Sequence, residues 1–307
     1  MIQYLSGRLL ATIPVVFGVT LAVFSMLFLI PGDPVKMMLS EFQTTPQQIA
    51  RMRAQLHLDE PFVAQYGRFV WNALHGNLGT SIRDHRPVAQ EILEVFPDTV
   101  ELAVAALAVA ATLGIGLGVL ASLRQNTWVD VGSMMVALLG VSMPSFWLAL
   151  VLVFVFSLRL GLFPASGGGG LSHLVLPAFA LGLGAAAIIA RLTRSSMLDV
   201  LRMEYMNTAR AKGLDDRTVV LRHGLHNALI PIVTVFGLQF GNLLAGTVII
   251  ETVFGRPGVG QLVVSAILNK DFPLVQGVVL FIAVGYVLVN LLVDVVYAIV
   301  DPRVRYG

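Results

Sequence analysis

The chain has 307 residues, of which 56% are hydrophobic and only 12% are charged, and its formal net charge is +2. Because ordinary soluble domains carry about 25% charged residues, this composition indicates an integral membrane protein without a large soluble core. The sequence contains no cysteine, which excludes disulfides and thiol-ligated metal sites.

Six long apolar runs predict transmembrane helices, because about 20 residues at about 1.5 Å each cross a hydrocarbon core of about 30 Å. They are Leu9–Ile30, Leu102–Leu123, Val131–Leu158, Leu174–Ala190, Ala228–Ile250 and Val275–Val293. The first run is too long for the core of a cleaved signal peptide, and no small-residue cleavage site follows it. We therefore expect an all-α integral membrane protein with six transmembrane helices.

The basic residues predict the orientation of these helices. With the N-terminus inside, the cytoplasmic segments hold eleven lysines and arginines and the short outer loops hold three. The other six lie in a long outer loop, which the positive-inside rule does not count. Both termini are therefore expected in the cytoplasm, and the pI of about 9.1 follows from topology rather than from nucleic-acid binding. Asp294, near the inner end of the sixth run, is expected to pair with Arg191 or Arg194.

The outer region between residues 31 and 98 contains signals for two amphipathic helices. Thr45 and Gln48 have the spacing of a capping box, with Pro46 at the first helical position. A second helix is expected after Pro61, with a stop at Gly76 and one apolar face formed by Phe62, Tyr66, Phe69 and Ala73. These helices either lie at the membrane surface or build a docking surface for a soluble partner.

The large inner loop, from about residue 191 to 227, predicts a helix–turn–helix elbow. The segment Met203–Lys212 has good helix formers and no proline, and Gly213 follows in the position where glycine ends a helix. Asp215 or Asp216 is a suitable N-cap for the next helix, which leads towards the fifth run. A rigid elbow between two membrane helices can transmit a push from a soluble motor, which a merely solvated basic loop cannot.

Three residues inside the apolar runs are candidates for a translocation pathway. Gln239 and Asn242 are three residues apart, and amides in mid-membrane are costly unless they face a cavity or a partner. Pro144 can break the third run and free carbonyl groups towards a pathway. The alternative, that the amides act as polar contacts between helices, stays open.

A family resemblance becomes visible in the inner loop. Asn207-Thr208-Ala209-x-x-x-Gly213 is similar to the Glu-Ala-Ala-x-x-x-Gly signature of ABC importer permeases, and Thr208–Gly213 with Asn227–Pro231 resembles the peptide/nickel branch in detail. Asn207 replaces the signature glutamate, and His226 replaces an arginine. Further motifs fit the branch in order along the chain: Pro31–Pro34, Gly76–Gly79, Ser142–Pro144, Thr193–Ser196, Pro257–Gly260, Asn290–Asp294 and Asp301–Arg303.

The resemblance implies a permease subunit of an ATP-driven importer in the bacterial cytoplasmic membrane. It implies a first membrane helix with the external helical region over residues 1–98, and a five-helix transmembrane core over 99–307 that contains the coupling loop 191–227. The implied partners are a second homologous permease subunit, two ATP-binding subunits, an extracytoplasmic solute-binding protein and the lipid bilayer. The residues implied to engage the ATPases are Asn207, Thr208, Ala209, Arg210, Ala211, Lys212 and Gly213.

The sequence predicts a transporter rather than an enzyme. Lys36, Lys212 and Lys270 are its only lysines, and none follows a glycine as the lysine of an ATP-binding phosphate loop does. ATP and magnesium are therefore expected on the partner subunits, with no cofactor and no metal in this chain. The branch transports peptides, glutathione and nickel, and peptide is the expected cargo, with glutathione or nickel as the alternative. A self-sufficient secondary transporter is the rival from another class, against which no buried charge relay or inverted repeat is evident.

Overall fold

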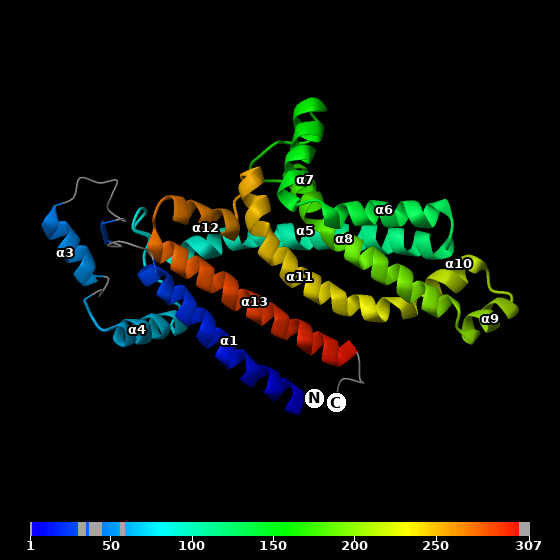
Figure 1. Cartoon of the computed structure of the whole chain (residues 1–307), viewed down its shortest axis with the longest axis horizontal. Coiled ribbons are helices and arrows are strands. Elements are labelled where there is room, and N and C mark those ends of the chain that lie inside the picture. Colours follow the sequence, from blue (N-terminus) through cyan, green and yellow to red (C-terminus); the bar gives the residue numbers. More distant parts are fainter. Residues whose placement is uncertain (1, 30–34, 37–44, 56–58, 301–307) are drawn as a thin grey trace. The chain divides into compact units, whose positions relative to one another are not determined.

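The computed structural model describes residues 2–29, 35–36, 45–55 and 59–300, and this part of the chain is helical, with one isolated bridge between Thr80 and Pro87. Figure 1 shows the helices. In chain order they are α1 (Ile2–Leu29), α3 (Pro46–Gln55), α4 (Phe62–Leu74), α5 (Val88–Leu123), α6 (Trp128–Ser142), α7 (Ser145–Leu152), η1 (Val153–Arg159), α8 (Ser172–Leu201), α9 (Glu204–Ala211), α10 (Asp216–Thr218), η2 (Val219–Leu225), α11 (His226–Phe254), α12 (Val259–Leu268) and α13 (Phe272–Val300). The expected all-α fold is confirmed for the described residues.

The helices gather into two compact units. One unit contains residues 98–257 and the chain from Val289 onwards, and the other contains residues 2–97 and 258–288. The first unit holds most of α5, all helices from α6 to α11 and the end of α13. The second unit holds α1, α3, α4, α12 and the beginnings of α5 and α13. The division at residue 98 that the sequence suggests stays a prediction.

Four described helices are long and apolar enough to cross a membrane, namely Val88–Leu123, Ser172–Leu201, Pro231–Phe254 and Phe272–Val295. A fifth crossing results if α6 and the helix Ser145–Arg159 count as one broken span. The first predicted span falls on α1, whose apolar stretch Leu10–Met26 is shorter than this test requires. The structure thus supports an integral membrane protein with four or five candidate spans in its described part, and six spans stay a prediction.

The third predicted span is broken at the proline that the sequence singles out. α6 ends at Ser142, Pro144 caps α7 in an extended conformation, and the two helices meet at 105°. Since proline has no N–H, the carbonyl group of Gly140 cannot receive its usual helical hydrogen bond. The predicted break at Pro144 is confirmed.

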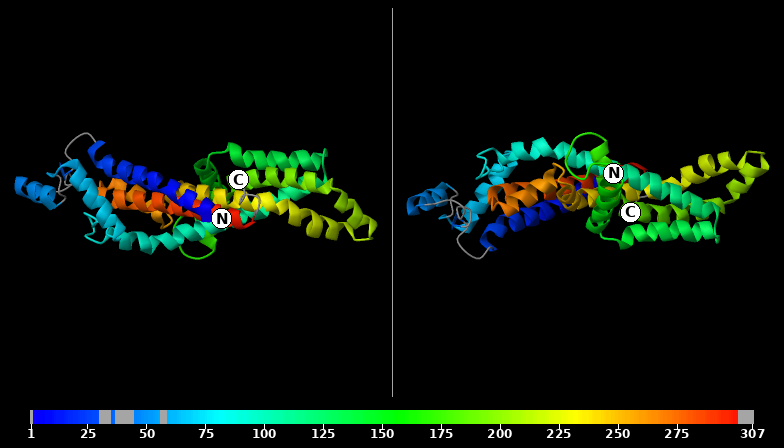
Figure 2. Two further views of the ribbon diagram at one scale, coloured as in Figure 1. Left: turned by 90° about the horizontal axis from the view of Figure 1, so that it is seen from below. Right: turned by 90° about the horizontal axis from the view of Figure 1, so that it is seen from above.

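Glycines allow the central helices of the first unit to approach closely. α8 packs against α5, α6 and α11 (Figures 1 and 2) around a core that includes Leu102, Ala106, Ala186 and Ile189. A Cβ atom on Gly182 would lie 2.4 Å from the carbonyl oxygen of Ala106. Similar contacts occur where three further glycines face α8: Gly114, Gly118 and Gly140. Small residues that permit close backbone approach are a main source of helix association in lipid, where no hydrophobic effect drives it.

In the second unit, a buried carboxylate fixes the turn that precedes α5. Asp271 is 2% exposed and its Oδ2 accepts hydrogen bonds from the Ser81 hydroxyl at 2.6 Å and the Ile82 N–H at 3.0 Å. Its other oxygen accepts from the Leu274 N–H at 3.2 Å, at the start of α13. One side chain therefore caps a helix and anchors a turn that is distant in sequence.

The capping box predicted at Thr45 and Gln48 is also confirmed, since the Thr45 N–H donates to Gln48 Oε1 at 2.8 Å.

We expect a larger side chain at Gly118 to separate α5 from α8. A Cβ atom there would lie 2.6 Å from the Ala190 carbonyl oxygen, whereas one at the exposed Gly116 meets nothing within 4 Å. Gly118→Val should therefore lower stability by about 1–3 kcal/mol or more, while Gly116→Val, with the same change of helix propensity, should not. Thermal unfolding in detergent measures both, and equal midpoints for the two variants would contradict the proposed close packing.

Candidate functional site

The predicted elbow is present, and its first helix ends as the sequence indicates. α9 covers Glu204–Ala211, and the N–H of Lys212 donates to the carbonyl group of Thr208 at 3.1 Å. Gly213 follows with φ +79°, a conformation that L-residues with a side chain adopt only at a cost. The end of the helix at Gly213 is therefore confirmed.

The second half of the elbow continues into a membrane helix without a loop. Asp215 is the N-cap of α10 and accepts a hydrogen bond from the Thr218 N–H at 3.1 Å. Hydrogen bonds from Thr218 hold the pKa of this carboxyl below its ordinary value, so the cap stays charged at neutral pH. α10 passes into the π-helix η2, which runs directly into α11 at His226. π-helical turns within longer helices are frequent at functional sites.

A small apolar core holds the two arms of the elbow together. Met206 and Ala209 of α9 and Val219 of η2 are buried and pack with Val200 and Leu201 at the end of α8. Ala209 therefore faces into the elbow, whereas Ala211 is exposed. The two alanines therefore do not share one surface. The exposed members of the predicted coupling segment are Asn207, Thr208, Arg210, Ala211, Lys212 and Gly213.

The two candidate pathway amides differ in exposure. Both lie on α11, but Gln239 is only 8% exposed, and Leu243, one turn further on, is also buried. Asn242 is exposed and follows Leu238, which is 52% exposed, at a spacing of four residues. The helix thus turns Gln239 towards the interior of the unit and Asn242 away from it.

The residues around the break before α7 are exposed. Ser142 and Pro144 are exposed, and Phe146 and Trp147 on the far side of the break are 48% and 46% exposed. Pro144 precedes α7 in the N-cap position, and its side chain accepts no hydrogen bond from the first N–H groups of this helix. Non-helical backbone at membrane depth is tolerated only where protein buries it or where it lines a water-filled cavity. The break therefore requires either water or another protein surface beside it.

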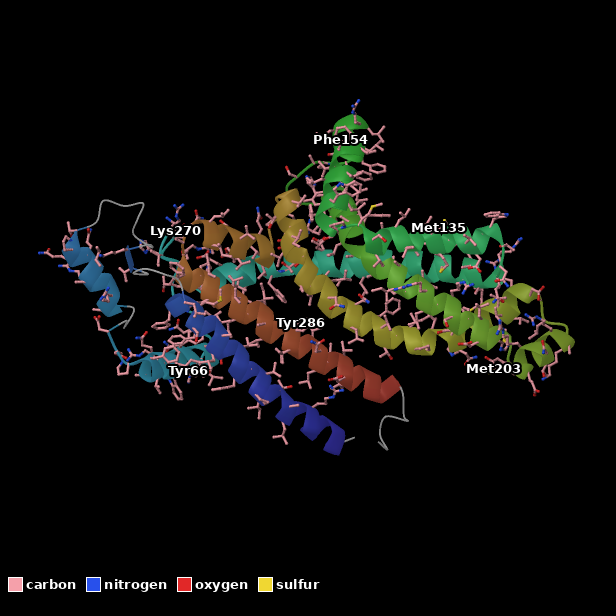
Figure 3. All side chains as sticks on the ribbon, in the orientation of Figure 1. Tyr66, Met135, Phe154, Met203, Lys270 and Tyr286 are labelled. Carbon is pink, nitrogen blue, oxygen red and sulfur yellow. The ribbon has the colours of Figure 1, made fainter. Side chains whose placement is uncertain are left out.

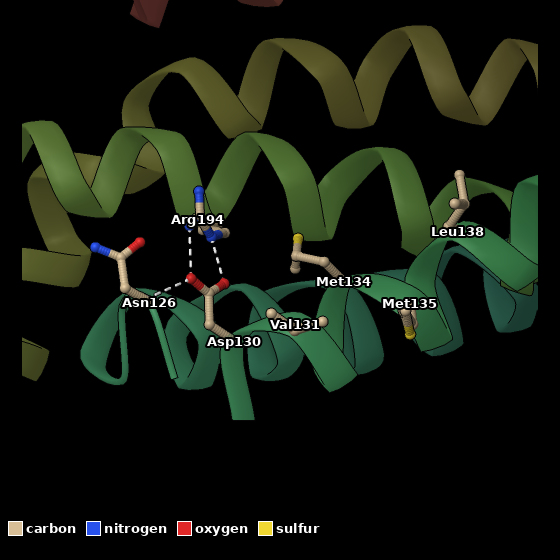
Figure 4. A pocket seen from close by; sticks show the side chains of 7 residues that line it. All are labelled: Asn126, Asp130, Val131, Met134, Met135, Leu138 and Arg194. Carbon is tan, nitrogen blue, oxygen red and sulfur yellow. Dashed lines mark hydrogen bonds and ion pairs between the residues drawn. The ribbon is translucent and has the colours of Figure 1, made fainter. Parts of the chain in front are cut away.

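A bidentate ion pair joins α6 to α8 near the elbow (Figure 4). Arg194 Nε and Nη2 each lie 2.6 Å from a different oxygen of Asp130, which is 4% exposed. The pair stands at one end of a groove of about 550 Å³ that Met134, Met135 and Leu138 also line. Nε and Nη2 of Arg194 are thus directed at Asp130, and the expected pairing of Asp294 with Arg191 or Arg194 stays a prediction.

A second charged cluster was not predicted from the sequence. Arg256 follows α11 and is 1% exposed, and its guanidinium lies 3.5 Å from Asp98 and in shorter contact with Glu101. Beside it, the Thr99 hydroxyl donates to Glu251 at 2.7 Å, and Glu251 is fully buried. Because Glu251 lies one residue beyond the predicted fifth span and Arg256 in a predicted outer loop, neither was expected to be buried.

The described residues contain no group of three or more histidine, aspartate or glutamate side chains arranged to hold a metal ion. His57, in the outer region, lies outside the described residues. The motifs Pro31–Pro34 and Asp301–Arg303 also lie outside them.

Two family models match nearly the whole chain. Residues 114–306 match the binding-protein-dependent transport system inner membrane component, and residues 1–103 match the N-terminal part of such membrane components. The chain belongs to this family. It is an ABC importer permease, as the motifs in the inner loop predicted.

Relatives and solved structures agree with this identification. The permease is 42% identical to the dipeptide transport system permease protein DppB of Alkalihalophilus pseudofirmus, with 100% of both chains covered. It is 43% identical to the di/tripeptide transport system permease protein DppB of Pseudomonas aeruginosa (100% and 99% covered) and 42% identical to the glutathione transport system permease protein GsiC of Escherichia coli K12 (100% of both). An inward-facing structure of the MetNI methionine ABC transporter matches 69% of the permease and 97% of its own chain, with a TM-score of 0.59 at 17% identity, which shows the fold alone.

Removal of the buried cation should destabilise the permease more than removal of an exposed one. Arg256→Gln removes the cation from Asp98 and Glu101, whose side chains are 34% and 51% exposed. The cost should therefore exceed that of a surface pair but stay below the roughly 3–5 kcal/mol of a fully buried pair. Arg86→Gln is the matched control, because Arg86 and Glu94 form an ion pair of half-exposed side chains, and such pairs contribute about 0–1 kcal/mol. Thermal unfolding midpoints in detergent should fall clearly only for Arg256→Gln, and similar shifts would show that burial of Arg256 contributes nothing.

Proposed function

We propose that this permease forms half of the translocation pathway of an ATP-driven peptide importer in the bacterial cytoplasmic membrane. The observation that carries the proposal is the elbow, a folded structure with its own apolar core and an exposed polar surface at Asn207–Gly213. Its second arm is continuous with α11, so displacement of the elbow moves a membrane helix directly. On this proposal the chain crosses the membrane six times, with both termini in the cytoplasm.

The exposed elbow surface is proposed to receive a separate ATP-binding subunit. Arg210 and Lys212 offer positive charge on this surface, and Thr208 and Ala211 leave room for close contact. ATP and magnesium would bind to two such subunits, a second homologous permease would complete the pathway, and a solute-binding protein would deliver cargo outside. The permease itself would then catalyse no reaction.

The pathway is proposed to run beside α11 and the break before α7. Asn242 presents an amide that can hydrogen-bond the backbone of a peptide without selecting a side chain. The exposed break at Pro144 requires water or protein beside it, which a pathway would provide, and α7 and α11 are in contact. Gln239 lies one helical turn from this surface on its buried side and is proposed to border the pathway.

A secondary transporter remains the rival. The absence of buried charges was one reason against it, and Glu251 and Arg256 weaken that reason, since both are buried. They lie at the end of α11 rather than in its middle, however, and Arg256 is held by Asp98 and Glu101 of α5. This position suits a link between helix ends better than a relay of protons through the membrane.

Uptake by reconstituted vesicles tests the function and the cargo together. Relatives are named for dipeptide, di/tripeptide and glutathione transport, so radiolabelled dipeptide should accumulate only when partner ATPases, binding protein and ATP are all present. Excess unlabelled glutathione or nickel should compete poorly. Accumulation driven by an ion gradient in vesicles that contain this chain alone would instead establish the secondary transporter.

Bulky substitutions should distinguish the role of the elbow's exposed surface from that of its buried core. Ala211→Trp adds volume at an exposed position, so it should abolish ATPase association and uptake and leave the thermal midpoint unchanged. Ala209→Trp places the same side chain in the buried core and should lower the midpoint as well. Gly213→Leu should strain the turn by about 1 kcal/mol or more, because φ is +79° there.

Co-purification with the ATPases measures association, and unfolding in detergent measures stability. Normal uptake in Ala211→Trp would remove this surface from the coupling mechanism. A loss of association in Ala209→Trp alone would show that only the integrity of the elbow matters.

Cysteine reactivity tests the pathway, because the chain has no native cysteine. Asn242→Cys and Ser142→Cys in the assembled transporter should react with a charged, water-soluble thiol reagent, and trapping of ATP should change their rates as access alternates. Gln239→Cys should react more slowly, since it is buried. Leu243→Cys controls for burial and Ile13→Cys, on an exposed apolar surface, controls for contact with lipid. If Asn242→Cys is as inert as both controls in every nucleotide state, the amide contacts another helix instead.

A further inference from the structure

The helix α4 has two separate apolar faces and one polar face. Phe62, Tyr66 and Phe69 repeat at helical spacing on the face that meets α1. A different stripe, displaced around the helix by about a quarter turn or more at 100° per residue, consists of Val63, Gly67, Val70, Trp71 and Leu74. The polar face carries Gln65, Arg68 and Asn72.

The first apolar face packs against α1. Phe24 of α1 contacts the rings of Phe62, Tyr66 and Phe69 at centroid distances of 5.2, 5.6 and 5.5 Å. The Tyr66 hydroxyl forms a hydrogen bond of 2.8 Å with Thr20 of α1. Figure 3 labels Tyr66 on α4. α4 is therefore fixed against the side of α1 by aromatic packing, with Tyr66 directed towards that helix.

The polar face is also used. Arg68 makes a bidentate contact with Glu60 at 2.7 and 2.8 Å, and Gln65 donates to the Glu60 carbonyl group at 2.7 Å. These bonds hold the start of α4 to the residues that precede it. The packing against α1 decides which residues of α4 remain on the outside.

The remaining stripe has no cover in the described part of the chain. Val63, Trp71 and Leu74 are 79%, 64% and 77% exposed. The His75 ring packs against Trp71 in a tilted arrangement, with a centroid distance of 4.4 Å, and its Nδ1 lies 2.8 Å from the Trp71 carbonyl oxygen, which holds the indole at the end of the stripe. This stripe offers valine, glycine and leucine side chains with a single indole N–H as its only polar group.

Lipid suits this stripe better than a soluble partner does. A surface that a soluble protein binds and leaves is exposed to water between encounters, and such surfaces are only about as apolar as the rest of a protein surface. The stripe also adjoins an apolar helix surface, since α1 exposes Phe17 and Phe28 at 57% and 44% beside the rings that hold α4. Tryptophan is enriched where hydrocarbon meets water.

We propose that α4 is an interfacial membrane helix whose stripe Val63–Leu74 contacts lipid acyl chains beside α1, while Arg68 and Asn72 face water. This decides between the two interpretations that the sequence leaves open for the outer region, in favour of the membrane surface. The inference rests on α1 crossing the membrane, which belongs to the proposed topology.

Site-directed spin labelling of the full-length chain in phosphatidylcholine and phosphatidylglycerol vesicles tests the proposal. Nitroxides at Val63→Cys and Leu74→Cys should collide more often with oxygen, which concentrates in lipid, than with a water-soluble nickel chelate. The matched control Arg68→Cys, on the same helix, should show the opposite preference. Ile13→Cys on α1, which is 63% exposed, should also favour oxygen.

Each outcome separates the inference from the topology on which it rests. If Ile13→Cys favours oxygen but both stripe labels favour the chelate, the stripe faces water and the docking interpretation replaces the proposal. If both stripe labels are shielded from both reagents, protein covers the stripe and the proposal fails. If Ile13→Cys favours the chelate, α1 does not cross the membrane and the topology itself is overturned. The two stripe positions are independent, so misfolding of one variant leaves the other as a test.

Discussion

Close backbone contact along α8 is the constraint on which the first unit depends. Lipid provides no hydrophobic force between helices, so their association relies on van der Waals contact and hydrogen bonds. Gly114 and Gly118 of α5 and Gly140 of α6 all approach α8 where no Cβ atom would fit, and Gly182 of α8 does the same against α5. Because α8 also leads to the elbow, the helix that organises the membrane core is also the helix that positions the elbow.

The elbow has no flexible joint on its far side. α9 is tied to η2 through Met206, Ala209 and Val219, and η2 passes into α11 without a loop. A force on α9 therefore reaches α11 through packed side chains and a continuous backbone. The ion pair between Arg194 and Asp130 supports this geometry, because it fixes α8 against α6 close to the point from which the elbow departs.

Signals that act over a few residues were predicted correctly. The capping box at Thr45, the glycine after α9, the N-cap at Asp215 and the break at Pro144 each depend on a backbone conformation or a hydrogen bond within about five residues. Their chemistry is therefore visible in the sequence. The family was likewise evident, because its motifs are local and occur in order along the chain.

Contacts between distant segments were not predictable in this way. Asp130 precedes Arg194 by 64 residues and Glu101 precedes Arg256 by 155, and nothing in the local pattern selects these partners over others. The exposure of a side chain likewise depends on segments that are distant in the sequence. Gln239 and Asn242 have the same chemistry and nearly the same helical position, yet the packing of neighbouring helices buries one and leaves the other exposed.

The placement of buried charge agrees with an energy source outside the chain. Asp130, with Arg194, lies in the first turn of α6, and Glu251 lies in the last turn of α11 with Arg256 just beyond it. Asp271 directly precedes α13. A transporter that moves its own protons or ions needs titratable groups along the middle of its spans, where the described helices of this permease carry amides, glycines and a proline break. Such groups allow passage and helix contact without binding an ion, in agreement with the proposal that a partner subunit acting on the elbow drives transport.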